Sequence, residues 1–174
     1  MTDRDRRVFD EQFSQLFQEH VERLTRVIDR LSGEPDLAAD LVQEAFVRLH
    51  RRGSLPDAPA AWVISVALNL FRNARSTGRR RARLLDMFVG SRVLTDPAPR
   101  ADERLDSEET RAGVRRALDG LSAREAQLLL LRAEGYSYRD IADALGLNEA
   151  SVGTLLARAK AGFRRSYEDG SHAS

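Results

Sequence analysis

The chain has 174 residues, which suits one or two small domains, and 42% of them are hydrophobic, enough for packed cores. It has no cysteine, which excludes disulfides, thiolate chemistry and cysteine-ligated zinc, and no apolar run approaches the length of a membrane span. The charged N-terminus lacks the apolar segment of a secretory signal, so we expect a cytoplasmic protein without direct membrane insertion.

Three helices are predicted in the first half of the chain from apolar residues at helical spacing. The first covers residues 10–31 and ends before Gly33 and Pro35. The second covers residues 36–52, and the third runs from Ala60 into the arginine-rich stretch. The loop between them, residues 53–59, carries one glycine and two prolines, which are typical of turns.

A linker and four further helices are predicted in the second half. Residues 90–106 contain prolines and many acids, which is typical of an extended, flexible segment. Helices follow at residues 110–118, at 123–134, at 138–145 and from 149 to about 167. No segment alternates with period two for long, so we predict an all-α protein. Two small helical domains, residues 1–89 and 107–174, would be joined by the linker at 90–106, without internal repeats.

Charge is segregated along the chain although the net charge is only +1. The stretch from Arg72 to Arg83 holds six arginines and no acid, whereas residues 96–109 hold six acids and two arginines. A local basic patch of this kind can attract phosphate despite a near-neutral total. The alternative is a charge run that only keeps the protein soluble.

The last third of the chain has the pattern of a helix-turn-helix. Gly146 provides a left-handed turn between two short amphipathic helices, and Ala142 is small where the second helix crosses over the first. The alternative is a pair of crossed helices that serves only to pack the fold and does not bind DNA. If the second helix enters the major groove, Ser151 and Thr154 at its N-terminal half could reach DNA, while the later Arg158 and Lys160 would meet phosphate.

The sequences DLAADLVQEAFVRLHRR (36–52) and AWVISVALNLFRNARSTGRRR (61–81) resemble the second conserved region of bacterial RNA polymerase sigma factors. Residues 121–165 resemble their fourth region. A chain that holds both regions and almost nothing else is similar to the extracytoplasmic-function (ECF) subfamily. The resemblance implies a transcription initiation factor that binds core RNA polymerase, recognises and helps to melt promoters and starts transcription of a regulon.

Two partner sites follow from the resemblance in the N-terminal half. It implies that the polar face of the second helix docks on the clamp helices of the polymerase β′ subunit, through Asp40, Gln43, Glu44 and Arg48. Leu41 is expected in the core, whereas Val42 and Phe46 are left open between core and interface. Minus-ten DNA would be bound by Asn69, which stands seven residues after Trp62, together with Arg72, Arg75, Arg79, Arg80 and Arg81. For Trp62 itself we prefer core packing, and Asn69 has the alternative of an ordinary surface residue.

The resemblance implies further partners in the C-terminal half and beyond. The helix-turn-helix would bind the minus-thirty-five element through Ser151, Thr154, Arg158 and Lys160, and the polymerase β flap would be a further contact. An anti-sigma factor would hold the protein inactive. The chain departs from the family pattern at two places. The family usually has Tyr-Arg or a similar pair where this chain has Ile64 and Ser65, and Lys or Arg where it has Gly153 and Leu155.

Two other classes of function are alternatives to a sigma factor. A free-standing helix-turn-helix regulator with an N-terminal partner-binding domain would dimerise on a palindromic site without joining polymerase. An enzyme has little support, because the sequence shows no phosphate-binding loop, dinucleotide fingerprint, nucleophile elbow or metal-ligand cluster. We therefore expect neither enzymatic activity nor a cofactor.

Overall fold

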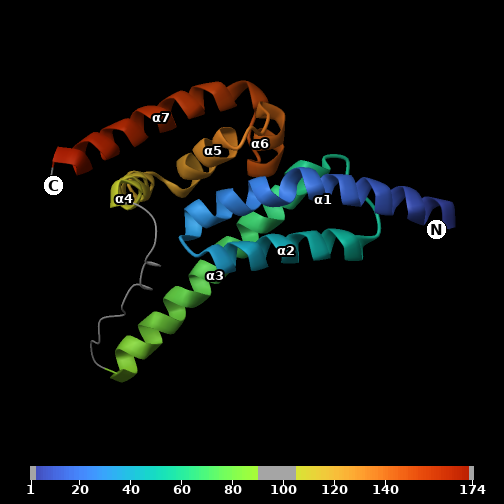
Figure 1. The fold of residues 1–174 in the computed structure, drawn as a ribbon, viewed down its shortest axis with the longest axis horizontal. Helices are drawn as coiled ribbons and strands as arrows, with labels where there is room; N and C mark the ends of the chain where they lie inside the picture. Colours follow the sequence, from blue (N-terminus) through green and yellow to red (C-terminus); the bar gives the residue numbers. More distant parts are fainter. Residues whose placement is uncertain (1–2, 90–104, 173–174) are drawn as a thin grey trace.

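The computed structural model describes residues 3–89 and 105–172, with side chains at 4–78 and 110–170. All regular structure in these residues is helical, which confirms the predicted fold class (Figure 1). The N-terminal module consists of α1 (Asp3–Ser32), α2 (Pro35–Arg52) and α3 (Pro59–Val89). The C-terminal module consists of α4 (Leu105–Asp119), α5 (Ala123–Ala133), α6 (Tyr138–Leu145) and α7 (Glu149–His172). Most of the predicted linker lies outside the described residues, and its bounds stay a prediction.

Three helices extend beyond their predicted ends. Helix α1 begins at Asp3 instead of residue 10, and α7 continues to His172. Helix α4 begins at Leu105, five residues before the expected start. Helix α4 packs against α7, and Figure 1 shows it beneath the C-terminal half of that helix. An amphipathic helix gains most of its stability from such packing. Their contact partly explains why both helices outlast their local sequence signals.

Polar side chains cap the starts of three helices in the C-terminal module. The Ser122 side chain accepts a hydrogen bond from the Glu125 backbone N–H, and the Glu125 carboxylate accepts one from the Ser122 N–H, which completes a capping box. Ser137 caps α6 through the Asp140 N–H, and the Asn148 side chain accepts from the Ala150 N–H at 3.0 Å. These caps satisfy donors that the first turn of each helix leaves unpaired.

Helix α2 turns one face into the N-terminal module. The buried residues follow helical steps of three and four along it: Ala38, Val42, Ala45, Phe46 and Leu49. Leu41, expected in the core, is half-buried and packs against the core from the edge of this face. Val42 and Phe46, which the sequence left open, are fully buried, so they belong to the core. Trp62 is half-buried and packs against the same core, in line with the preferred interpretation.

The helix-turn-helix is formed by α6, the turn at Gly146 and the first half of α7. Gly146 adopts φ 64°, the left-handed conformation that the sequence predicted. Ala142 is only 2% exposed, and Ile141 and Val152 are completely buried beside it. This packing fixes the angle between the two helices and leaves the outer face of α7 open.

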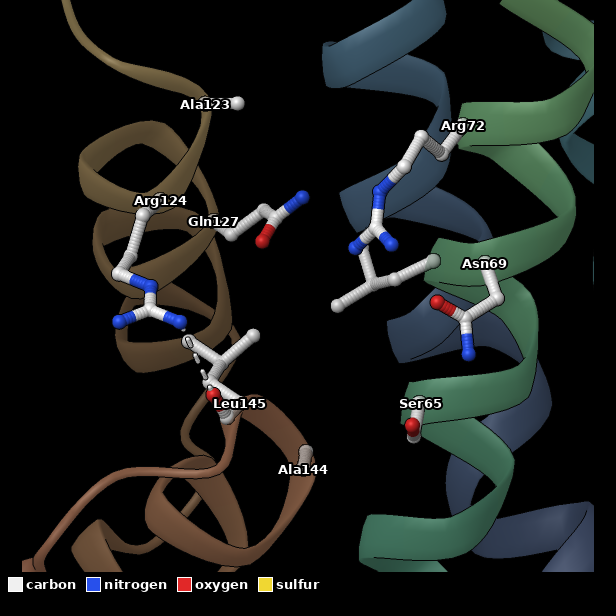
Figure 2. Close-up of a pocket in the computed structure, with 9 residues that line it drawn as sticks. Ser65, Asn69, Arg72, Ala123, Arg124, Gln127, Ala144 and Leu145 are labelled. Atoms are coloured by element: carbon white, nitrogen blue, oxygen red, sulfur yellow. Dashed lines mark hydrogen bonds between the residues drawn. The ribbon is translucent and has the colours of Figure 1, made fainter.

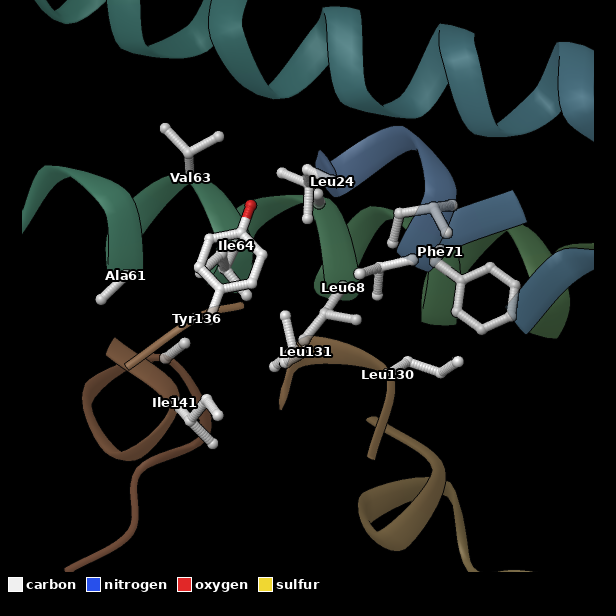
Figure 3. Packing of buried hydrophobic residues seen from close by; sticks show 14 of the residues in the cluster. Leu24, Ala61, Val63, Ile64, Leu68, Phe71, Leu130, Leu131, Tyr136 and Ile141 are labelled. Atoms are coloured by element: carbon white, nitrogen blue, oxygen red, sulfur yellow. The ribbon is translucent and has the colours of Figure 1, made fainter. Parts of the chain in front are cut away.

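The two modules share one hydrophobic cluster. Helices α3 and α6 contact each other directly, as do α1 and α5. Figure 3 shows Leu68 and Ile64 of α3 beside Leu131 and Tyr136 of the C-terminal module, and all four residues are buried. The structure is therefore a closed arrangement in which each module covers part of the other. No helix in the described part of the chain is long and apolar enough to cross a membrane.

Candidate polymerase and nucleic-acid interfaces

The candidate polymerase-binding residues form one outward stripe on α2. Asp40, Gln43 and Arg48 are exposed, and Glu44 is half-buried beside them. The Arg48 Nε donates a hydrogen bond of 2.8 Å to a carboxylate oxygen of Glu44, one helical turn away. The opposite face of α2 is buried, so the core fixes the direction in which this polar stripe points. The structure thus brings these four predicted residues together on one surface.

A groove lies next to this stripe, between α1 and α2. Its walls include three phenylalanine rings: the ring centroids of Phe17 and Phe46 are 5.0 Å apart, and those of Phe13 and Phe46 are 6.2 Å apart, both in edge-to-face geometry. Gln43 also lines the groove and links it to the polar stripe. A partner that docked on α2 would therefore meet polar groups and apolar rings side by side.

Asn69 and Arg72 point away from the α3 core towards the C-terminal module. Figure 2 shows both side chains on one side of a cleft, with Gln127, Arg124 and Leu145 on the other side. The cleft has a volume of about 200 Å³. Arg124 donates to the Leu145 carbonyl oxygen at 3.5 Å, which ties the far wall of the cleft together. Asn69 and Arg72 are themselves exposed.

The rest of the predicted minus-ten surface is described only in part. Arg75 is exposed one turn beyond Arg72, and α3 continues as a helix to Val89. The backbone of Arg79, Arg80 and Arg81 belongs to this helix, but their side chains lie outside the described residues.

The recognition helix α7 presents its candidate residues to solvent. Ser151, Thr154, Arg158 and Lys160 are all exposed. Gly153 packs closely against the Tyr138 ring: a Cβ atom built at position 153 would lie 3.5 Å from Cε2 of Tyr138. Tyr138 is 41% exposed, and the Arg132 guanidinium carbon lies 5.3 Å from its ring centroid. An aromatic ring and an arginine thus flank the helix where its own sequence lacks basic residues.

Three ionisable groups have shifted pKa values. Hydrogen bonds from Ser122 lower the pKa of Glu125, which reflects the capping box. Burial lowers the pKa of His20 and raises the pKa of Tyr136 to about 12. His20 and Tyr136 stack on each other where the two modules meet, with ring centroids 5.6 Å apart.

A charged cluster at that junction was not predicted from the sequence. Glu134 at the end of α5 is bonded to arginines of α1 more than a hundred positions earlier. Each of these residues looks like part of a solvated helix face when it is viewed within its own helix, so only a contact map could have found the cluster. Among the described residues, no group of three or more His, Asp or Glu side chains is placed to hold a metal ion.

The comparisons with known proteins match both modules. Residues 16–81 match the model "Sigma-70 region 2", and residues 111–161 match "Sigma-70, region 4". The chain is 30% identical to the ECF RNA polymerase sigma factor SigE of Mycolicibacterium smegmatis over 87% of its length and 60% of that protein's length. It is 33% identical to the ECF sigma factor SigM of Mycobacterium tuberculosis over 88% of its length and 76% of that protein's length.

Two solved structures share the fold. One is the sigma factor RpoE in complex with the anti-sigma factor NepR from Bartonella quintana, with a TM-score of 0.60, 23% identity, and 91% of this chain and 98% of that chain covered. The other is CnrH in complex with the cytosolic domain of CnrY, with a TM-score of 0.62, 20% identity, and 93% and 91% covered. The chain holds both sigma-70 regions in order and has ECF sigma factors among its relatives. It therefore belongs to the ECF family of RNA polymerase sigma factors, non-enzymatic proteins that direct RNA polymerase to promoters.

Proposed function

We propose that this chain binds core RNA polymerase, directs it to a set of promoters and helps to open the DNA there. The observation that carries this proposal is that one chain presents two separate exposed surfaces whose residue types suit DNA binding. One is the α3 face with Asn69, which continues into the arginine block, and the other is the exposed recognition helix α7. Because polymerase is found with its DNA, we expect this function in the cytoplasm.

Core polymerase binds the exposed stripe on α2 in this proposal. The carboxylates of Asp40 and Glu44 and the amide of Gln43 offer hydrogen-bond acceptors and a donor on a rigid helix. The helices of the β′ clamp are the partner that the family resemblance assigns to this stripe. The neighbouring aromatic groove would bury apolar side chains of the same partner.

The α3 face would hold the melted minus-ten strand. A base that has left the stack exposes its Watson–Crick edge, and the Asn69 amide can both donate to it and accept from it. Arg72 and Arg75 lie on the same exposed side of α3, and Arg79, Arg80 and Arg81 follow in sequence. Their positive charge would hold the strand through its phosphates.

The helix-turn-helix would bind the minus-thirty-five duplex, with α7 in the major groove. Ser151 and Thr154 lie on the exposed side of its first two turns, where base edges are reached. Arg158 and Lys160 lie further along the helix and would contact phosphates. The shortage of basic groups on the first turns favours a modest contribution of this contact to affinity.

The energetics require a larger partner. Opening DNA costs about 1.4 kcal/mol per stacked step, so a bubble of about a dozen base pairs costs on the order of 15 kcal/mol. One captured base and a few arginines supply much less than that. The chain therefore acts as a specificity subunit, and polymerase provides the cleft and most of the DNA contacts.

Other partners follow from the family. Structural neighbours were solved in complexes with NepR, an anti-sigma factor, and with the cytosolic domain of CnrY. We expect an anti-sigma factor to regulate this chain too, and the polymerase β flap to contact its C-terminal module.

The deciding experiment mixes the purified chain with purified core polymerase. The proposal expects the two to co-elute from a sizing column, and run-off transcription on a genomic library to start at new sites. Core polymerase alone and the chain alone are the controls. A dimeric protein that binds palindromic DNA tightly without core would instead support the free-standing regulator. A lack of co-elution, or initiation that is the same with and without the chain, would refute the proposed function.

A further inference from the structure

The turn between α5 and α6 reaches out of the C-terminal module and contacts α1. We call residues 134–136 the interdomain turn. One carboxylate oxygen of Glu134 accepts from Arg26 Nε at 2.8 Å, and the other accepts from Arg30 Nη1 at 2.6 Å. Arg23 Nε donates to the backbone carbonyl oxygen of Glu134 at 2.8 Å, at the negative end of α5. These hydrogen bonds use both side-chain oxygens of Glu134, and its side chain is only 8% exposed.

Tyr136 anchors the same turn in the N-terminal module. The residue is completely buried, and its ring stacks on His20 of α1 with an angle of 11° between the planes. The Arg23 guanidinium carbon lies 4.2 Å from the centre of the ring, within the range of a cation–π contact. Figure 3 shows the ring beside Ile64 of α3. Gly135 adopts φ 84° between Glu134 and Tyr136, so both side chains can reach the N-terminal module from adjacent positions.

This contact holds α6 against α3 and places the C-terminal module directly opposite the proposed minus-ten surface, whose residues Asn69 and Arg72 stay exposed at the cleft between the modules. Asn69 and Arg72 then face Gln127 and Leu145 across a cleft of about 200 Å³. Pockets that enclose even a small molecule have volumes of about 300–1,000 Å³. A single strand with an extruded base and its flanking phosphates therefore has no room in the closed cleft.

Promoter geometry also requires the modules to separate. The names of the two promoter elements place them about 25 base pairs apart, which corresponds to roughly 85 Å at about 3.4 Å per base pair. Helix α7, with 24 residues, is about 36 Å long, and α6 at its N-terminal end packs directly on α3. Two surfaces that are this close cannot occupy both elements at once.

We propose that the interdomain turn is an autoinhibitory latch, in which Glu134, gripped by Arg26 and Arg30, keeps the two modules closed until core polymerase separates them. This inference rests on the proposed function, because closure inhibits only a protein that must bind both promoter elements. A closed state lowers the apparent affinity for a partner in proportion to the fraction of molecules that are open.

Several features make the latch reversible. The side chains of Arg26 and Arg30 are 48% and 45% exposed, so water can compete for them as soon as the contact loosens. His20 Nδ1 and Tyr136 Oη are buried without a protein hydrogen-bond partner, and their desolvation opposes closure. The rest of the contact between the modules is packing of α3 against α6 and of α1 against α5.

The test compares Glu134→Gln with Glu22→Gln in the full-length protein. Glu22 is a matched control, because it pairs with Arg26 at 3.9 Å within α1 and does not bridge the modules. Since the chain has no cysteine, two spin labels can be attached at cysteines introduced at the exposed positions Asp36 and Ala161. The measurements are the distance distribution between the labels and the rate of association with core polymerase.

We expect Glu134→Gln to raise the open population and the association rate by about fivefold, and Glu22→Gln to leave both unchanged. The triple variant Arg26→Glu, Arg30→Glu, Glu134→Arg reverses the charges and should restore closure. An unchanged distance distribution in Glu134→Gln would overturn the latch, and so would opening without faster association. If the wild-type protein itself does not bind core, the proposed function fails and the inhibitory role fails with it, whereas normal wild-type binding isolates a failure of the latch alone.

Discussion

Closure of the two modules should depend on pH through His20. The His20 side chain is 9% exposed and stacked on Tyr136. The charged groups that act on it are Glu19 and Arg23 of its own helix and Asp140 of α6. Burial lowers the pKa of His20, Glu19 and Asp140 oppose this effect, and Arg23 adds to it. The closed form therefore favours the neutral imidazole.

The sign and the ceiling of the effect follow from linkage. Opening is expected to expose His20 to water, so that its pKa returns towards the ordinary value of 6.5. Above this pH both forms are neutral, and the contribution of His20 to closure is fully present. Below it the open form takes up the proton first, so closure loses up to about 1.4 kcal/mol, or tenfold, per pH unit. The loss stops once the pH falls below the lowered pKa of the closed form.

The assay measures the distance between labels at positions 36 and 161 from about pH 7.5 to about pH 5.5. The wild-type protein should open as the pH falls. His20→Phe keeps the ring stack and cannot be protonated, so it should stay closed. It also removes a buried nitrogen without a partner, whose burial costs about 1–3 kcal/mol. His50→Phe is the control, because His50 is exposed and contacts Phe13 and Phe9 instead of Tyr136.

Two results would refute this reasoning. One is a wild-type distance distribution that does not change with pH. The other is a His20→Phe variant that opens over the same pH range as the wild-type protein, which would assign the response to another group. The response of His50→Phe should match the wild-type response.

Three further predictions concern the proposed surfaces. Asn69→Ala should lower open-complex formation, measured by permanganate footprinting, with core binding unchanged; a fall in core affinity would contradict its assignment to DNA. Asp40→Ala combined with Glu44→Ala should weaken core binding by roughly 100-fold or more, measured by competition with another sigma factor, because hydrogen bonds to charged groups contribute about 1.5–3 kcal/mol each and about 1.4 kcal/mol is tenfold; equal competition would remove α2 from the interface. Ala142→Leu should destabilise the helix-turn-helix by about 1–3 kcal/mol in thermal unfolding, because the site is 2% exposed and has no room for extra methylenes; an unchanged melting temperature would show that the crossing is loosely packed.

The local sequence determined the helices and their ends. Helix caps and turns depend only on residues a few positions away along the chain. Sequence spacing alone is therefore enough to assign the capping roles of Ser122 with Glu125 and of Ser137, and the turn at Gly146. The buried positions of the helix-turn-helix were equally predictable, because Ile141, Ala142 and Val152 are fixed by one short corner. The two conserved regions were identified for the same reason, since each is a continuous segment.

The face of a helix that enters the core was less certain. Leu41, Val42 and Phe46 are all apolar and adjacent, and the helical period alone allows the buried face to rotate by one position. The packing of α1 and α3 against α2 decides that Val42 and Phe46 are buried and that Leu41 lies at the edge.

Only the tertiary structure decided how the two modules meet. Arg26 and Glu134 are 108 positions apart, and each lies on a helix surface where a charged residue needs no partner. The closed arrangement depends on the pairing of these surfaces and on Tyr136 entering the opposite module, and neither leaves a periodic signal in the sequence. Helix formation and capping depend on neighbours along the chain, whereas contacts between modules depend on groups that only folding brings together.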